Sequence, residues 1–400
     1  MTTAVGSLIK HISGLRGQVD QCEVGKSSAY KEIMANQVLE NILPTYSGLV
    51  QSINQIACKL FQGDSFAVEK VPFSGLSGSI FYQVKDTETN EVLCLAKVFP
   101  EDRSYEFLDE VFSLHAYGQH SIPCPKVLDV GLINKQCVLI EEMVPGDTLD
   151  HHIKKLFNCE KGSENREKQL QQVIELFKSL GSSFADFHSK GSSDLVPTDP
   201  YVKEHFQGII DNAIKELQNA NHEVDEYYGI TDKASFIASL REYIEKSQHL
   251  LQKPVPKSYI HADCNFANFI YGEDEKFHLL DTWWGGFSVD KESAPRGNPF
   301  LDYMQVINRL WYSYKDGKLS FDEFQKLQTA FQKGYKTIGM IPDEDMQNFY
   351  SFIDAMLLLG GVTKYFQYCC GKDSIGRFAK YWMTWLEELL GSQHKIKHAI

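Results

Sequence analysis

The chain has 400 residues and a formal net charge of −13, with 53 acidic against 40 basic residues. Its length suits two lobes plus an extension and is ample for a sizeable hydrophobic core. The acidic balance argues against nucleic acid as a partner, and no segment has the unbroken apolar length of a membrane span.

The first residues lack the pattern of a secretory signal. Residues 1–11 show no charged start followed by a continuous apolar core. The nine cysteines show no Cys-x-x-Cys spacing and mostly stand in apolar runs. We therefore expect reduced thiols and a cytoplasmic protein. Export by a specialised secretion machine would leave no pattern of this kind.

Residues 1–66 are expected to form a helical extension. Apolar residues recur at helical spacing over 29–43 and 49–61. The extension either packs against the lobe that follows or offers a surface to a protein partner.

The segment 67–143 has the parts of a nucleotide-binding lobe. A Gly/Ser-rich turn at 73–79 precedes a strand-like run at 80–84. Glycines would let the backbone approach phosphates and serines would donate hydrogen bonds, although such a turn is also typical of a plain hairpin. The candidate phosphate-binding residues are Ser74, Gly75, Ser77, Gly78 and Ser79.

A single lysine, Lys97, stands inside the apolar run at 92–99. It must reach solvent or find an anion, and nucleotide phosphates would supply one. In the helix expected from Ser104, Glu106 and Glu110 are four residues apart and share a face, so either could pair with Lys97. We prefer Glu110 because it directly precedes apolar residues that would pack on the sheet. The alternative is a solvated acidic face.

A second apolar run, at 137–140, leads through two glutamates to Pro145-Gly146 and is typical of a strand that leaves the lobe through a hinge. Main-chain groups from Glu142 to Val144 would then meet a purine edge. The remainder, 144–400, is expected to form a larger, mostly helical lobe. Helical periodicity is present near 165–190, 203–222 and 234–252.

The pattern His261-x-Asp263-x4-Asn268, followed by Asp281, carries the most chemical information. Phosphoryl transfer needs a group that orients the acceptor hydroxyl and takes its proton. It also needs hard oxygen ligands that hold a divalent metal on the phosphates. Asp263 suits the first task, whereas Asn268 and Asp281 suit the second. The alternative is a polar turn in which His261 is an ordinary buried histidine.

All five tryptophans follow Asp281. Trp283, Trp284 and Trp311 are candidates for an aromatic wall that binds a cationic acceptor through cation–π attraction. Aromatic residues at helical spacing are also typical of a packed core. Trp283 and Trp284 stand out because they follow the candidate metal ligand closely.

Residues 316–324 match the second half of a calcium-binding helix-loop-helix. The first two ligand positions would be Tyr312 and Tyr314, which offer no carboxylate. A turn into a helix, with Ser320 as N-cap and Glu323 closing a capping box, explains the same residues.

These features together resemble the aminoglycoside phosphotransferase and choline kinase family, distant relatives of the eukaryotic protein kinases. The resemblance spans about residues 71–303 and rests mainly on the pattern from His261 to Asp281. Further support comes from Lys97, Glu110, Pro145-Gly146 and the segments 122–128, 180–188 and 297–302.

The family implies an α+β, bilobal protein-kinase-like fold, with a small β-rich N-lobe and a large, mostly helical C-lobe. It also implies transfer of the γ-phosphate of ATP or GTP to a hydroxyl, with Asp263 as base and Asn268 and Asp281 on Mg²⁺. We expect His261 to support the catalytic loop rather than to touch substrate. Ala262 stands where the family usually has glycine, and Asn298 where aspartate is common. No catalytic group is missing, so we expect an active enzyme.

A small-molecule acceptor is favoured over a protein acceptor. About twenty residues separate Asp281 from Asp302, and Ser293-Ala-Pro-Arg296 lacks the glutamate that ends the peptide-binding segment of protein kinases. The acceptor types that fit are aminoglycosides, choline-like amino-alcohols and sugars, with ATP and GTP equally suitable as donors. The alternatives are a protein-modifying kinase of effector type and a catalytically silent nucleotide-binding module.

Overall fold

The computed structural model describes most of the chain and divides it into two compact units. Unit 1 comprises Met1–Thr148 and Asn268–Pro295, and unit 2 comprises Leu149–Ala267 and Arg296–Ile400. The described residues are 5–8, 39, 43–63, 66–74, 78–101, 104–190, 192–196, 200–220, 230–253, 255–281, 296–336, 341–369, 386 and 390.

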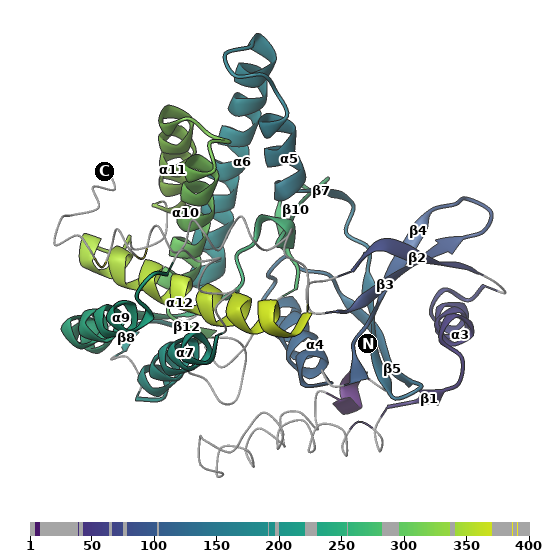
Figure 1. Cartoon of the computed structure of the whole chain (residues 1–400). Helices are drawn as coiled ribbons and strands as arrows, with labels where there is room; N and C mark the ends of the chain where they lie inside the picture. The colour runs from purple at the N-terminus through teal and green to yellow at the C-terminus, as the bar shows by residue number, and fades with distance from the viewer. Residues whose placement is uncertain are drawn as a thin grey trace. The chain divides into compact units, whose positions relative to one another are not determined.

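Unit 1 is built on a six-stranded sheet with the order β1-β5-β6-β4-β3-β2 (Figure 1). The pair β1–β5 is parallel, and the other neighbours are antiparallel. The strands are β1 (Thr45–Tyr46), β2 (Phe66–Ser74), β3 (Ile80–Asp86), β4 (Val92–Val98), β5 (Val127–Ile133) and β6 (Gln136–Glu142).

A helix lies on each face of this sheet: α3 (Leu49–Phe61) on one and α4 (Ser104–Gln119) on the other (Figure 1). Because successive strand residues point to opposite faces, one strand contributes to two cores. On β6, Ile140 belongs to the same core as Ile56 of α3, whereas Leu139 belongs to the core that includes Val111 of α4. The alternation therefore assigns each strand residue to a defined side of unit 1.

Apolar residues from the start of the chain join the core beneath α4. Val5, Leu8, Leu39 and Leu43 are buried in the same cluster as Phe107 of α4. The helix predicted at 49–61 is confirmed as α3. The helix predicted at 29–43 lies outside the described residues except at its end. The extension therefore contributes side chains to the core that holds α4.

A second, three-stranded sheet completes unit 1, with the order β11-β10-β7. Its strands are β7 (Gly146–Thr148), β10 (Phe269–Gly272) and β11 (Phe277–Leu279). Gly146 has a φ of 138°, and a Cβ there would lie 2.3 Å from the carbonyl oxygen of Tyr271. Only glycine lets β7 approach β10 in this way.

Unit 2 is mostly helical. Its helices are α5 (Leu149–Phe157), α6 (Glu164–Ser189), α7 (Pro200–Asn219), α9 (Lys233–Ser247), η2 (Gln248–Gln252), α10 (Pro299–Lys315), α11 (Phe321–Tyr335) and α12 (Glu344–Cys369). A small sheet joins β8 (Ser192–Val196), β9 (Val255–Tyr259) and β12 (Arg296–Gly297), and a 3-10 turn, η3, spans Phe266–Asn268.

The helices α6 and α11 pack with a close backbone-to-backbone approach. A Cβ added to Gly334 would lie 2.1 Å from the carbonyl oxygen of Lys178, and one added to Gly181 would lie 2.1 Å from that of Phe331. At one end of the pair, Arg166 Nε lies 2.6 Å from Glu323 Oε1. This contact ties the first turn of α6 to the first turn of α11.

The α+β class expected from the sequence is confirmed, with a β-rich and a mostly helical part. The capping box at Ser320 and Glu323 is present at the start of α11. Within the described part of the chain, no helix combines the length and apolar character that crossing a membrane requires. The free thiols in the described part of the chain are those of Cys58, Cys94, Cys124, Cys137, Cys159 and Cys264.

Candidate active site

Lys97 is the centre of the charged cluster in unit 1. It lies on β4, opposite Phe81 of β3 and Leu139 of β6, and is 3% exposed. Its Nζ lies 2.7 Å from Glu110 Oε2 and 2.6 Å from Asp281 Oδ1. Of the two glutamates that the helix offers, Glu110 therefore contacts the lysine, as expected.

Burial and neighbouring charges shift the pKa values of Lys97 and Glu110 in opposite directions. Burial lowers the pKa of Lys97, but the carboxylates of Glu110 and Asp281 outweigh that effect, so the pKa lies above its ordinary value. Burial raises the pKa of Glu110 above its ordinary value, although the Lys97 ammonium opposes the rise. Lys97 is therefore a fixed positive charge at neutral pH.

The candidate metal ligands lie at the same end of the β10–β11 hairpin. Phe269 pairs with Leu279, and the amide of Leu280 donates to the carbonyl oxygen of Asn268 at 2.9 Å. This pairing brings Asn268 next to Asp281, whose side chain is 56% exposed. Mg²⁺ ordinarily takes one or two protein oxygens and completes its shell with phosphates and water. An amide and a carboxylate fit that donor set.

In unit 2, the loop that carries Asp263 is held by a buried aspartate of α10. Asp302 Oδ2 accepts from the amide of His261 at 2.6 Å, and Oδ1 accepts from the amide of Ala262 at 2.8 Å. His188 of α6 lies 3.2 Å from the same carboxylate through Nε2, and its Nδ1 lies 2.7 Å from the Tyr335 hydroxyl. Asp302 and His261 are both completely buried.

A glutamine of α10 supports the same loop. Gln305 accepts from the amide of Cys264 at 3.0 Å and donates to the carbonyl oxygen of Ala262 at 3.1 Å. The amide of Asp263 lies 3.3 Å from His261 Nδ1. Ala262 has a φ of 64°, in the left-handed region that favours glycine. The loop thus has a fixed backbone on both sides of Asp263.

A partly buried cation, Arg309, lies on α10 within electrostatic reach of Asp263. Arg309 Nη1 lies 3.0 Å from Asp354 Oδ2 of α12. Burial lowers the pKa of Arg309, but Asp354 and, more weakly, Tyr312 and Asp263 raise it above its usual range. The negative charge of Asp263 is therefore partly balanced by Arg309.

Asp302→Asn is expected to loosen the catalytic loop. A neutral amide replaces two charge-assisted hydrogen bonds, so we expect a loss of about 2 kcal/mol in the free energy of unfolding. Hydrogen exchange should quicken at the amides of His261 and Ala262. The control is Asp186→Asn, which changes only an exposed pair with Lys190 on α6. Unchanged exchange at the two loop amides would contradict the role of Asp302.

The predicted phosphate loop is described in part. Gly75, Ser77 and the side chain of Ser74 lie outside the described residues. Gly78 has a φ of 82°, and Ser79 is buried. A left-handed glycine at this point leaves its amide free of a side chain that would block a close approach.

The predicted hinge residues follow β6. The amide of Glu142 donates to the carbonyl oxygen of Lys126 at 2.9 Å, and its carboxylate lies 3.1 Å from Lys126 Nζ. Val144 is buried. The Glu142 amide is thus engaged by the neighbouring chain segment.

The aromatic wall stays a prediction. Trp283 and Trp284 lie outside the described residues. Trp311 is buried on α10, with Lys315 Nζ 4.9 Å from the ring centre and the ring edge against Tyr312. A lysine of the protein thus already occupies a position over this ring.

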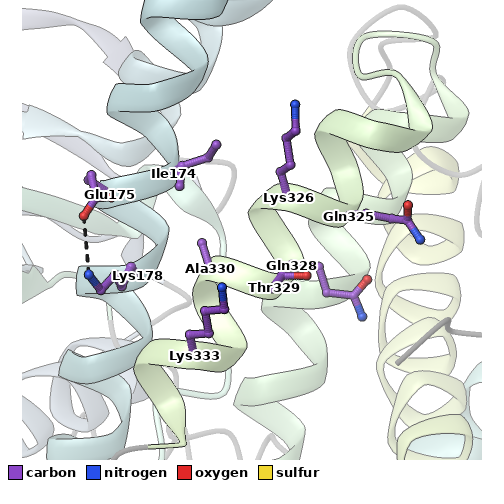
Figure 2. Close-up of a pocket in the computed structure, with 9 residues that line it drawn as sticks. All are labelled: Ile174, Glu175, Lys178, Gln325, Lys326, Gln328, Thr329, Ala330 and Lys333. Carbon is purple, nitrogen blue, oxygen red and sulfur yellow. Dashed lines mark ion pairs between the residues drawn. The ribbon is translucent and has the colours of Figure 1, made fainter.

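A groove of about 520 Å³ lies between α6 and α11 (Figure 2). Lys326 and Lys333 line it from α11, and Lys178 lines it from α6 beside Glu175, its ion-pair partner at 3.7 Å. The groove contains none of the candidate catalytic residues. Glu175, the acid in its described lining, is paired with Lys178.

Four residues received no role from the sequence: Glu141, buried on β6, and the loop-supporting residues His188, Asp302 and Gln305. Asp302 is the last residue of the motif from Gly297 to Asp302, and this position was the sequence signal for its importance. Glu141 stands as an acid inside an apolar strand, which marks a buried charge. No local pattern distinguishes His188 or Gln305 from ordinary helix residues.

Comparison with solved structures identifies the fold of the chain. No family model and no curated protein sequence match the chain. An amicoumacin kinase, solved with AMP-PNP and Ca²⁺, is 15% identical, with a TM-score of 0.51 over 90% of this chain and 96% of its own. A Ralstonia eutropha protein provisionally described as an aminoglycoside phosphotransferase is 15% identical, with a TM-score of 0.51 over 85% and 98%.

The chain has the kinase-like fold of these proteins. The family resemblance inferred from the sequence is thus confirmed at the level of fold. In this kinase-like chain, Lys97, Glu110, Asn268 and Asp281 belong to unit 1, whereas His261 and Asp263 belong to unit 2.

Proposed function

We propose that the chain is a small-molecule kinase that transfers the γ-phosphate of ATP or GTP to a hydroxyl group. The observation that carries the proposal is the buried Lys97 ammonium, bonded to Glu110 and to Asp281, which is 184 residues away in the sequence. An ammonium has three donors, and Glu110 and Asp281 use two of them. The third is left for a phosphate oxygen.

The residues of unit 1 have complementary roles in holding the nucleotide. Lys97 presents its charge to the phosphates, and Glu110 fixes the position of that charge. Asn268 and Asp281 would hold a divalent cation, which supplies charge neutralisation for the phosphates when bound. The turn that ends at Gly78 and Ser79 would donate main-chain hydrogen bonds.

Asp263 is proposed as the base of the transfer. Its carboxylate orients the acceptor hydroxyl and takes the proton as the oxygen bonds to the γ-phosphorus. The bond from that phosphorus to the β–γ bridging oxygen breaks, and the nucleoside diphosphate leaves with the electron pair. His261, fully buried beside the Asp263 amide, is proposed to brace the loop rather than touch substrate.

A small hydroxyl compound is the proposed acceptor. The amicoumacin kinase, which has the same fold, is named after a small molecule. In this chain, the segment between Asp281 and Asp302 is too short for the peptide platform of a protein kinase. The net charge of −13 favours a cationic compound, such as an amino-alcohol or amino-sugar.

The test is transfer of radiolabelled γ-phosphate with Mg²⁺ across a panel of amino-alcohols, sugars, nucleosides and aminoglycosides. We expect one acceptor class to be labelled, and Asp263→Ala to lower the rate by about 10²–10⁴-fold because the base is lost. Asp150→Ala is the control, because Asp150 pairs only with Lys154 on the surface of α5.

Two outcomes would overturn this proposal. Phosphate incorporation into protein, with every small acceptor unlabelled, would favour a protein-modifying kinase. Nucleotide binding without transfer to any acceptor, and unchanged by Asp263→Ala, would favour a silent nucleotide-binding module.

A further inference from the structure

Glu141 lies on the same face of the unit 1 sheet as Lys97. The register pairs Leu95 of β4 with Glu141 of β6, and Lys97 with Leu139. Directly opposite residues of antiparallel strands share a face, and so do residues two apart on one strand. Glu141 is therefore a diagonal neighbour of Lys97, on the side of the sheet that α4 covers.

The Glu141 side chain is largely buried, and its carboxylate has no hydrogen-bonding partner among the described residues. It is 8% exposed, and no described residue donates a hydrogen bond to it or forms an ion pair with it. Lys97 acts on it as a charge, but the ammonium is bonded to Glu110 and Asp281. The next residue, Glu142, pairs with Lys126 instead.

A largely buried carboxylate without a protein donor is unfavourable unless water or a ligand satisfies it. A hydrogen-bond donor brought by a ligand would satisfy it. Glu141 lies between the Lys97 cluster, proposed for the phosphates, and Glu142–Val144, proposed for the purine edge. The base of a bound nucleotide is the part of the ligand that would come nearest to this position.

We propose that Glu141 sets the base specificity of the nucleotide site by accepting a hydrogen bond from the 6-amino group of adenine. This inference rests on the proposed nucleotide-dependent function. An ionised carboxylate can only accept hydrogen bonds. The 6-amino group of adenine donates, whereas the 6-oxo group of guanine or hypoxanthine is a second acceptor. The site therefore selects ATP over GTP and ITP.

The charges around Glu141 favour this role over a second bond to Lys97. Glu110 on α4 and Asp281 after β11 already surround the ammonium, so a third carboxylate would add repulsion. Burial raises the pKa of the Cys94 thiol on β4 and of the Cys124 thiol, and the Glu141 charge raises both further. Neither thiol donates a hydrogen bond to the carboxylate.

The test measures dissociation constants for ATP, GTP, ITP and the triphosphate of unsubstituted purine riboside. Measurements at pH 8.5 keep the carboxyl ionised, because burial raises the pKa of Glu141 to about 7. Wild type should bind ATP at least about tenfold more tightly than the other three, as expected for a hydrogen bond to a charged group.

Glu141→Gln separates hydrogen bonding from charge. The amide can accept from a 6-amino group or donate to a 6-oxo group, so the ratio of ATP to GTP affinity should fall to within about threefold of unity. Glu141→Met, which can do neither, should bind ATP and the unsubstituted purine triphosphate alike. Glu91→Gln, on the exposed turn before β4, should keep the wild-type ratios.

The outcomes distinguish this inference from the proposed function. If wild type binds ATP and GTP equally, or GTP more tightly, the assignment of Glu141 is wrong while the kinase proposal stands. An unchanged ratio in a folded Glu141→Gln protein overturns it as well. If wild type binds none of the four triphosphates, the proposed function itself fails.

Discussion

Lys97→Met is expected to lower kcat/KM for phosphoryl transfer by about 10²–10³-fold, the range typical of removing one preorganised electrostatic partner. The substitution keeps the apolar stem of the side chain but removes the ammonium. Glu110 and Asp281 then lose the cation that lies 2.7 and 2.6 Å from them. The phosphates would meet two carboxylates with no positive charge between them.

The measurement is steady-state kinetics with the acceptor found by the labelling panel, together with the nucleotide dissociation constant. Lys85→Met is the matched control, because Lys85 lies on the neighbouring strand β3 and pairs with Glu69, which is half exposed. Near wild-type kcat/KM in a folded Lys97→Met protein would contradict the role of Lys97. Equal losses in both variants would point to damage to the sheet.

The pairing of Lys97 with Glu110 was predictable because both signals are local. A lysine in an apolar strand must find an anion, and helix spacing leaves only Glu106 and Glu110 on one face. The structure selects Glu110 because Phe107 and Val111 beside it are buried in the core under α4. Helix geometry then turns the carboxylate toward the sheet.

The second bond of Lys97 was not predictable from any local pattern. Asp281 was expected as a metal ligand, yet its carboxylate also lies against the ammonium, 184 residues away in the sequence. The contact depends on the β10–β11 hairpin, whose pairing places Asp281 at one end. Such placement is set by tertiary packing, which neither strand periodicity nor helix periodicity encodes.

In the catalytic loop, too, the local pattern was predictable from the sequence and the long-range contacts were not. Its own pattern predicted Asp263 and the supporting role of His261, because residue types at fixed spacing indicate the chemistry. The groups that fix the loop come from α10. Asp302 accepts from the amides of His261 and Ala262, and Gln305 donates to the carbonyl oxygen of Ala262. Hydrogen bonds between distant segments carry no spacing signal.

The buried extension is a further example. Helical spacing predicted α3 correctly, but the burial of Val5, Leu8 and Leu39 in the core under α4 had no sequence signal beyond their apolar character. Because α4 carries Glu110, these side chains contribute to the packing that positions the Lys97 partner. The extension is thus continuous with the structure around the proposed nucleotide site.

Glu141→Gln is expected to raise the free energy of unfolding at pH 8.5 by up to about 3 kcal/mol and to leave it unchanged near pH 4. Burial raises the pKa of Glu141 from its ordinary value of 4.5 to about 7 in the folded chain. The folded state therefore holds this proton more tightly than the unfolded state. As the pH rises from 4.5 to 7, the unfolded chain loses its proton first, and the wild-type protein loses stability relative to the glutamine variant.

Urea unfolding of both proteins between pH 4.5 and 8.5 measures the difference. It should grow up to about pH 7 and stay constant above, because the carboxyl is then ionised in both states. Glu91→Gln, at an exposed position, should show no such pH dependence. A difference that is constant across this range, or that shrinks as the pH rises, would contradict the burial of an unpaired carboxyl. A side chain that destabilises the fold at neutral pH can be retained when it is needed for binding. If both proteins bind ATP as proposed, saturating ATP should raise the free energy of unfolding of wild type more than that of the glutamine variant.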